Sequence, residues 1–271
     1  MNINYSKELS RPEKLEADKW INEALFGYNH VEGHIKKLKQ DANVLEVGCG
    51  SGILLSMFSN HFKKIYFQGI EPFGAGFASL AKLNQTIKKQ GVNIFNIGFE
   101  EFKPKKKYDL IYCVNVFEHF SDWRLFIKTA HLWLKDSGSL IILCPNYGFP
   151  YESHFGLPII FNKKITYMLF KNYIDQYELD NNSKGLWNSL NFVTKKKLVS
   201  FVKRKSFFLL NDDMSIMDDM VDRLSHDIQF RKRHKILGYA AIFLKKIGFF
   251  ILLTLVPNLI PYMKIVLIKR N

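Results

Sequence analysis

An acidic residue followed by three alternating glycines is the first place where this chain could do chemistry. Glu46 lies near the end of an apolar run, and Gly48, Gly50 and Gly52 follow it before a helical segment begins. Glycine allows open backbone turns and a close approach of a ligand to the main chain, and the start of a helix favours a carboxylate or a phosphate. The segment therefore predicts a loop that binds an anionic or zwitterionic ligand.

The same residues argue against a dinucleotide. A nicotinamide-binding fingerprint would need glycine at positions 48, 50 and 53, but Ile53 occupies the last position, and Glu46 would crowd a pyrophosphate. Glu71 ends the next apolar run, about twenty residues beyond the loop, where a carboxylate can accept both hydroxyls of a ribose. Together Glu46 and Glu71 favour a cationic ligand that carries a ribose.

These residues resemble those of the class I S-adenosylmethionine-dependent methyltransferases. The resemblance rests on Val44–Gly52, Glu71, the segment Tyr108–Phe120, and segments 134–140 and 192–208. It implies an α/β fold of the Rossmann-like, doubly wound type, with a mostly parallel seven-stranded sheet and helical insertions. It also implies S-adenosylmethionine as the cofactor and methyl transfer as the reaction. Residues 150–156 look like a stretch of bacterial methyltransferases encoded with surface-glycan pathways.

The resemblance assigns a cofactor site at the carboxyl ends of the strands. Glu46 and Gly48 would lie near the methionine moiety, Glu71 would hold the ribose, and Phe73 would lie against the adenine. The expected cofactor-binding residues are Glu46, Gly48, Cys49, Gly50, Gly52, Glu71, Pro72, Phe73, Gly98, Phe99, Asn115 and Val116.

The third-strand end departs from the family pattern. Gly98 stands where many relatives have an aspartate that binds the adenine amino group. We therefore expect packing of Phe99, or a backbone contact, to replace that side chain. Asn115 and Val116 would border the methionine end.

Two histidines are candidates for the general base. A hydroxyl acceptor must lose a proton, and a histidine with an ordinary pKa of about 6.5 is suited to accept it. His119 and His154 follow the fourth and fifth predicted strands, at the edge where open α/β sheets bind ligands. We expect His154 to be the base. The alternatives are structural: His119 would bond to backbone at the start of a helix, and His154 would belong to a structural turn. The expected catalytic residues are His154, His119 and Glu152, which would orient His154, and the expected substrate contacts are Tyr147, Tyr151 and Glu118. No metal ion is expected, because displacement at a sulfonium mainly requires positioning and exclusion of water.

Short β-branched runs alternate with helical stretches from residue 43 onward, which is typical of a parallel sheet with crossover helices. The predicted strands are 43–47, 64–70, 92–97, 108–114, 139–144, 207–210 and 265–268. The predicted helices are 77–90, 125–134, 195–203 and 215–229, with Ser121 or Asp122 capping the second and Thr194 the third.

The chain divides into four parts. Residues 1–40 form an N-terminal helical cap, 41–145 the Rossmann-like core that binds S-adenosylmethionine, and 146–193 a substrate lid. Residues 194–271 complete the sheet and contain a basic and apolar helical insertion at 212–261. The lid segment is too long and irregular for an ordinary connection.

Composition excludes several classes of protein. With 271 residues, 47% of them hydrophobic and 24% charged, the chain must fold around a large core. Cys49, Cys113 and Cys144 form no CxxC pair, which argues against a zinc or disulfide framework. The start of the chain is polar and lacks the apolar run of a secretory signal. A cytoplasmic location follows as the expectation.

The C-terminal part carries most of the net charge of +14. Residues 190–271 hold 16 Lys/Arg against 6 Asp/Glu, and the run 247–263 contains no charged residue. Pro257 and Pro261 argue against a spanning helix, so 231–256 is expected to lie at an anionic membrane surface at its inner face. A buried helix or a dimer contact is the alternative. The basic residues that would face lipid are Arg231, Lys232, Arg233, Lys235, Lys245 and Lys246.

The sequence favours transfer of a methyl group to oxygen of a small-molecule, glycan or lipid-linked acceptor, with nitrogen as the alternative atom. RNA methylation is a second interpretation, motivated by the positive charge and the many aromatic residues. Segment 115–118 lacks the Asn-Pro-Pro-aromatic cluster often used on flipped bases, so nucleic acid is not the expected partner. A third interpretation is a membrane-surface protein that keeps the fold without catalysis. The acceptor and the oligomeric state stay open.

Overall fold

The central strands form where the chain is apolar on both faces. The side chains from Leu110 to Cys113 and from Leu140 to Pro145 are all buried, as expected for parallel strands that helices cover on each side. The computed structural model describes residues 11–74, 76–77, 80–213, 215–227, 230–231, 239, 243, 245 and 260–270, with side chains from residue 20 onward.

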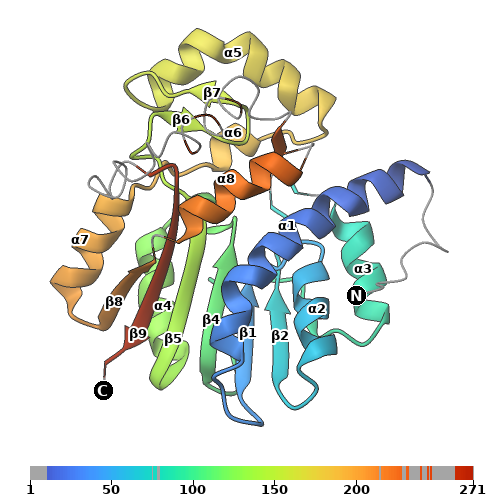
Figure 1. Cartoon of the computed structure of the whole chain (residues 1–271), viewed down its shortest axis with the longest axis vertical. Coiled ribbons are helices and arrows are strands. Elements are labelled where there is room, and N and C mark those ends of the chain that lie inside the picture. The colour runs from blue at the N-terminus through green and yellow to red at the C-terminus, as the bar shows by residue number, and fades with distance from the viewer. Residues whose placement is uncertain are drawn as a thin grey trace.

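Seven strands make one twisted sheet in the order β3-β2-β1-β4-β5-β9-β8 (Figure 1). All neighbours from β3 to β5 are parallel, whereas β9 is antiparallel to both β5 and β8. This arrangement confirms the predicted α/β fold with a mostly parallel seven-stranded sheet. The strands are β1 (Asn43–Val47), β2 (Tyr66–Ile70), β3 (Ile94–Phe95), β4 (Tyr108–Val114), β5 (Leu134–Pro145), β8 (Phe208–Asp213) and β9 (Tyr262–Lys269).

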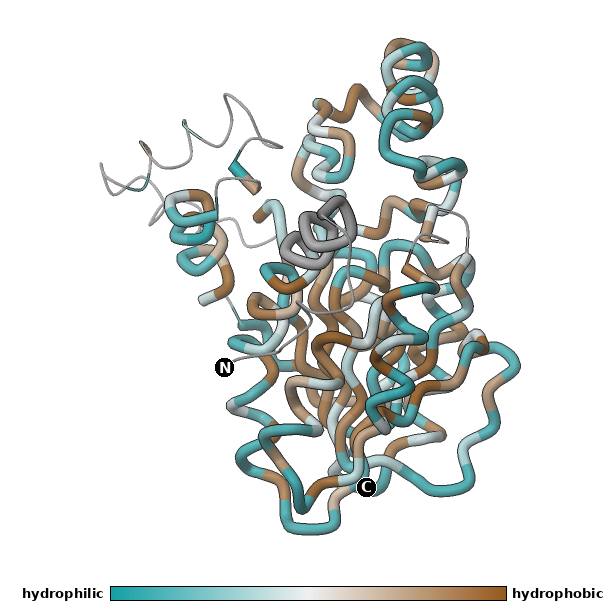
Figure 2. The backbone as a smooth tube through the Cα atoms, turned by 90° about the vertical axis from the view of Figure 1, so that its right-hand side faces the viewer, coloured by the Kyte–Doolittle hydropathy of each residue, from teal (hydrophilic) through white to brown (hydrophobic). Residues whose placement is uncertain are grey.

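Helices cover the two faces of the sheet and enclose two apolar cores. One core packs the sheet against α1 (Arg11–Ile35) and α2 (Ile53–His61), and the other packs it against α4 (Trp123–Trp133) and α7 (Lys195–Lys205). The apolar strands run through the middle, and hydrophilic turns lie at the end opposite the carboxyl edge (Figure 2). The other helices of the sheet region are α3 (Ala81–Lys89), the 3-10 turn η2 (Phe117–His119) and α8 (Ile216–His226).

Residues 146–193 form a further layer, which we call the upper layer, beyond the carboxyl ends of the strands (Figure 1). It consists of β6 (Tyr151–Glu152), β7 (Leu157–Pro158), α5 (Lys163–Asp180) and α6 (Leu186–Ser189). The layer has its own apolar core around Phe155, Ile174 and Trp187. It therefore packs as a unit of its own and lies where a substrate lid was expected.

The element boundaries differ from the predictions where local signals compete. Helix α4 begins early, at Trp123, because the Asp122 side chain accepts hydrogen bonds from the backbone of Arg124 and Leu125. Strand β5 starts at Leu134 instead of Ser139, since its first residues pair with β4 through an irregular register. Strand β3 is only two residues long.

The predicted membrane segment is only partly described. Residues 232–238 and 246–259 lie outside the described residues, and the predicted run 247–263 ends inside β9, which begins at Tyr262. Arg231 donates to the carbonyl oxygens of Leu224 and Ser225, and Lys245 pairs with Asp222 at 2.8 Å. These two cations therefore contact α8. In the described part of the chain, no helix combines the length and the apolar character that crossing a bilayer requires.

Gly52, which precedes α2, has a packing role that a stability measurement can test. Its φ is +82°, and a Cβ there would lie 2.5 Å from Ile94 Cδ1. We expect Gly52→Ala to lower the free energy of unfolding by about 2–4 kcal/mol in urea titrations, through backbone strain and overpacking. Gly33→Ala in α1, where a Cβ has no neighbour within 4 Å, should raise it by about 0.5–1 kcal/mol. Equal effects of the two substitutions would contradict this role of Gly52.

Candidate active site

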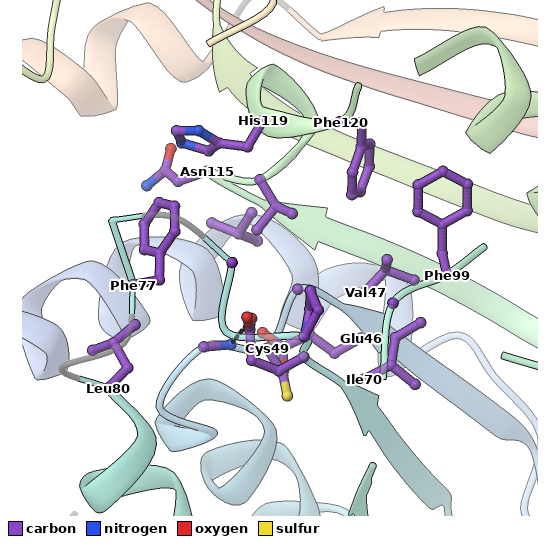
Figure 3. A pocket seen from close by; sticks show the side chains of 18 of the residues that line it. Glu46, Val47, Cys49, Ile70, Phe77, Leu80, Phe99, Asn115, His119 and Phe120 are labelled. Atoms are coloured by element: carbon purple, nitrogen blue, oxygen red, sulfur yellow. Dashed lines mark hydrogen bonds between the residues drawn. The ribbon is translucent and has the colours of Figure 1, made fainter. Parts of the chain in front are cut away.

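A cavity of about 290 Å³ opens at the carboxyl ends of β1, β2 and β4 (Figure 3). It occupies the position at which open α/β sheets bind ligands. Most of the residues predicted to bind a cofactor line it together: Glu46, Gly48, Cys49, Gly50, Glu71, Pro72, Gly98, Phe99, Asn115 and Val116, with His119 from the predicted catalytic set.

Glu46 lies at the floor of the cavity and is almost fully buried, with 3% of its surface exposed. The Tyr112 hydroxyl donates a hydrogen bond of 3.0 Å to its Oε2 and fixes the carboxyl from behind. Burial raises the pKa of Glu46 to about 8, and the nearby charge of Glu71 adds to this effect. A cation in the cavity would therefore stabilise the ionised form of Glu46.

Glu71 is positioned by the backbone of the loops around it. Gly50 N–H donates to Oε2 at 2.9 Å and Phe73 N–H donates to Oε1 at 2.8 Å. Burial raises the pKa of Glu71, although both hydrogen bonds act in the opposite direction. Asn84 donates to the Gly50 carbonyl oxygen at 2.7 Å and holds the loop from α3. Each carboxylate oxygen keeps a free acceptor position for a hydroxyl group.

The three glycines of the loop have different roles. A Cβ on Gly48 would lie 2.3 Å from Val116 Cγ1, so this residue lets the loop pack against the end of β4. A Cβ on Gly50 would come near only Leu80 Cδ1, at 3.3 Å, because Gly50 faces the cavity. Gly52 does not line the cavity and serves the packing of α2 instead.

The opposite wall of the cavity is aromatic and apolar. Phe99 and Phe120 meet edge to face with ring centroids 5.0 Å apart, and both line the cavity (Figure 3). Phe73, which was expected against the adenine, is absent from the described lining, whereas Phe77 lines the cavity beside His119, with ring centroids 4.9 Å apart. The backbone at Phe73 has a positive φ of 53° and directs its N–H to Glu71.

Glu100 lines the cavity beside Gly98, where the sequence predicted no side-chain carboxylate. Its Oε2 lies 2.9 Å from the position that a Cβ on Gly98 would take. The carboxylate two residues later therefore reaches the place of the aspartate that many relatives have. The acidic residue in the segment Gly98–Glu100 was the sequence feature from which a carboxylate at this place could have been predicted.

Asn115 connects the end of β4 to distant parts of the chain. Its Nδ2 donates to Glu23 Oε2 of α1 at 3.3 Å, and Tyr262 of β9 donates its hydroxyl to Asn115 Oδ1. Arg223 of α8 pairs with Glu23 at 3.0 Å. Trp20 and Glu23 of α1 also line the cavity. The sequence did not predict them, because no pattern within this polar helix indicates a contact with residue 115.

His119 lies on the cavity wall with a defined tautomer. Its Nδ1 is 2.8 Å from the Ser189 hydroxyl, which itself donates to the Leu186 carbonyl oxygen. Ser189 therefore accepts from His119, so Nδ1 carries the proton and Nε2 is a free lone pair. Burial lowers the pKa of His119 well below its ordinary value, with further lowering by the charge of His154. The residue is a neutral imidazole.

His154 lies next to His119, with ring centroids 5.3 Å apart, but is absent from the described cavity lining. Its Nδ1 is 2.7 Å from Glu152 Oε1, so the predicted pair is formed. Burial alone would raise the pKa of Glu152, but His154 and two backbone N–H donors lower it overall. Glu152 is therefore ionised and orients the imidazole of His154.

The predicted substrate contacts do not reach the described cavity lining. Glu118 is completely buried behind His119, and burial raises its pKa to about 7. The Tyr147 hydroxyl donates to Glu152 at 3.2 Å, and Tyr151 lies in β6 of the upper layer. Glu118 lies close to His119 and His154, and we call these three residues, of which Glu118 is buried and the histidines are partly buried, the base cluster.

Comparison with known proteins agrees with this geometry. Residues 16–207 match the model of the methyltransferase domain family. The chain belongs to the methyltransferase domain family. This match confirms the predicted class of enzyme, a methyltransferase.

Three proteins that are similar to this methyltransferase match it over most of its length. An uncharacterised protein of Mycobacterium tuberculosis is 30% identical over 223 residues, which cover 81% of this chain and 75% of that protein. The crystal structure of a plantazolicin methyltransferase with S-adenosylhomocysteine (SAH) and a substrate analogue has a TM-score of 0.54 at 13% identity, covering 97% of this chain and 92% of its own. A mycolic acid cyclopropane synthase with SAH has a TM-score of 0.54 at 16% identity, covering 86% and 80%. The two solved structures share the fold of this methyltransferase.

The buried carboxyl of Glu46 gives a pH dependence with a definite sign. A carboxyl whose pKa is higher in the folded state stabilises the fold at low pH and loses this contribution as the pH rises toward the folded value. We expect Glu46→Gln to be more stable than wild type at pH 8, by on the order of 3 kcal/mol, and equally stable near pH 4.5.

Urea unfolding of both proteins between pH 4.5 and 8 checks this expectation. Glu101→Gln, on an exposed turn, is the matched control and should follow wild type. A stability difference between Glu46→Gln and wild type that is constant with pH would rule out a buried, protonated Glu46.

Proposed function

We propose that this methyltransferase uses S-adenosylmethionine to methylate an oxygen atom of a small-molecule, glycan or lipid-linked acceptor. The observation that carries the proposal is the pair of buried carboxyls, Glu46 and Glu71, on either side of the glycine loop at the cavity. Both carboxyls have raised pKa values, so a positively charged ligand at this place gains an attraction that a neutral ligand does not. S-adenosylmethionine bears an ammonium and a sulfonium group as well as a ribose.

The donor set of the cavity fits each part of this cofactor. Glu71 keeps acceptor positions for the ribose hydroxyls, and Phe99 and Phe120 offer an apolar wall to the adenine. Glu100 lies beside Gly98, where its carboxylate can accept from an adenine amino group. Gly50 leaves the loop open in front of the methionine end, next to Glu46.

When bound, S-adenosylmethionine supplies an electrophilic methyl group on its sulfonium sulfur. The residues of the chain position the acceptor oxygen and take its proton, so that the O–CH3 bond forms as the S–CH3 bond breaks. His119 is the member of the base cluster on the cavity wall, and its Nε2 lone pair faces inward to Glu118. Glu152 keeps His154 oriented beside it. A buried cluster of bases suits removal of a proton from a hydroxyl, and an amine acceptor is the alternative.

The upper layer supports an acceptor with a lipid portion. Phe161, Met168 and Leu169 are 90%, 69% and 63% exposed at or near the start of α5, and Lys164 and Lys171 are exposed on the same segment. Lys171 pairs with Asp175 at 2.7 Å, which leaves the exposed apolar side chains, with Lys164 beside them, as the feature that supports contact with a membrane surface. We therefore propose α5, above the cavity, as the membrane-facing part of the protein, and a surface-glycan or lipid-linked hydroxyl as its acceptor class.

Binding of the cofactor is tested by isothermal titration calorimetry with S-adenosylmethionine. We expect Glu71→Gln to weaken binding about 10- to 100-fold, through loss of charge-assisted hydrogen bonds. Gly50→Val should abolish detectable binding, because a β-branched side chain would enter the cavity from a residue at positive φ. Glu101→Gln should bind as wild type does. Wild-type affinity in Gly50→Val would remove the cofactor from this loop.

The acceptor is tested by transfer of a labelled methyl group into cell extracts separated into lipid, glycan and RNA fractions. We expect label in the lipid or glycan fraction, and His119→Ala and His154→Ala to lower its rate by about 10²- to 10⁴-fold while S-adenosylmethionine still binds. His131→Ala in α4 should retain the wild-type rate. Label confined to RNA would favour the alternative substrate class, and unchanged rates in both cluster variants would exclude the base cluster from the reaction.

A further inference from the structure

Three Lewis-base atoms converge beside the cavity. Glu118 Oε1 lies 3.9 Å from His119 Nε2 and 3.7 Å from His154 Nε2. One ligand atom from each residue can be chosen so that all three lie within 4.8 Å of one another. The distances are too long for hydrogen bonds between these atoms, and they leave a space that a small ion could fill.

Glu118 is buried without the hydrogen bonds that usually compensate for burial of a carboxylate, as far as the described residues show. The residue has 0% of its surface exposed, and neither carboxylate oxygen has a hydrogen-bond partner in the described part of the chain. His119 Nε2 is likewise buried there without a hydrogen-bond partner. A buried carboxylate is costly unless it is paired, hydrogen-bonded or bound to a metal ion. The described ion-pair neighbours of Glu118 are the two histidines alone.

The outer nitrogen of each imidazole is occupied, so that the inner nitrogen is directed at Glu118. His119 Nδ1 donates to Ser189, and His154 Nδ1 donates to the ionised Glu152. Glu152 is fixed in turn by the backbone N–H of Phe155 at 2.7 Å. Histidines that ligate metals almost always donate their other N–H to a carboxylate, a carbonyl or a similar acceptor, which fixes the ring and its tautomer.

We propose that Glu118, His119 and His154 bind a divalent first-row transition-metal ion such as Zn²⁺. Two imidazole nitrogens and one carboxylate form a donor set that suits these ions, and three protein ligands leave a coordination position open. With bonds of about 2.1 Å, neighbouring ligand atoms lie about 3.4 Å apart in a tetrahedral site. The two observed separations from Glu118, 3.7 and 3.9 Å, are slightly longer than this, and all three ligand atoms lie within 4.8 Å of one another.

The role of the ion rests on the proposed function, whereas its binding does not. His119 also lines the cavity, so an ion held on its Nε2 would be separated from the cavity by the imidazole ring. Such an ion would supply Lewis-acid chemistry: an acceptor hydroxyl that reached its open coordination position would lose its proton to solvent more readily before its oxygen takes the methyl group. In this form of the site the base cluster acts as a ligand set, and the acceptor class is a hydroxyl compound that coordinates through oxygen.

The test is a titration of the chelator-treated full-length protein with ZnCl₂ by calorimetry, and with CoCl₂ by visible absorption, both without S-adenosylmethionine. We expect stoichiometric binding and a cobalt spectrum with nitrogen and oxygen ligands. Glu118→Gln and His154→Ala should each weaken Zn²⁺ binding at least about 100-fold, and Ser189→Ala, which removes an outer hydrogen bond, about 10-fold. His131→Ala, which alters a histidine of α4 outside the cluster, should bind Zn²⁺ as wild type does.

Folding of each variant is checked by circular dichroism and thermal unfolding. If Glu118→Gln does not fold, Ser189→Ala and His154→Ala decide the matter with the same titrations. Absence of binding in wild type, or binding that these variants leave unchanged, overturns the metal site. If wild-type protein binds Zn²⁺ but shows no binding of S-adenosylmethionine in a separate calorimetric titration, the proposed function is overturned and the metal site is not. The two failures are therefore distinguishable.

Discussion

Burial of carboxyl groups at one edge of the sheet is the constraint on which the site depends. Glu46, Glu71 and Glu118 lie at the carboxyl ends of neighbouring strands and are each at least nine-tenths buried. Burial disfavours the charged form of a carboxyl, and each of the three has a raised pKa. The fold maintains this unfavourable arrangement because the surrounding sheet and two apolar cores supply the stability. Such arrangements are characteristic of sites that bind a cation or move a proton.

The parts of the site that follow directly from a strand could be predicted from the sequence. Glu46, the glycine loop and Glu71 are adjacent to strands whose apolar runs are easily recognised, and parallel pairing brings them to one edge. The role of Phe73 could not be predicted, since a positive φ turns its backbone and Phe77 lines the cavity instead. Trp20, Glu23 and Ser189 were missed because their contacts join residues 70 or more positions apart in the chain. The sheet itself was predictable because alternation of strands and helices is a local pattern, whereas the boundaries of β3 and β5 depend on their neighbours.

The candidate site is divided between the sheet and the upper layer. The sheet holds the cavity with Glu46 and Glu71, while the upper layer brings His154, Glu152 and Ser189 to the histidine of η2. The upper layer has its own apolar core around Phe155 and Trp187. The upper layer is also tied to the sheet region, because Asn191 donates to the carbonyl oxygens of Phe117 and Phe120.

The position of β9 has a consequence for how the protein is made. This strand comes last in the chain but pairs with β5 on one side and β8 on the other. During translation β8 leaves the ribosome before β9, and it finds its described partner in the sheet only when β9 has been synthesised. Tyr262 of the same strand reaches Asn115 beside the cavity. The nascent polypeptide therefore completes the site only after β9 has been made, and products that end before this strand would expose an unpaired strand edge prone to aggregation.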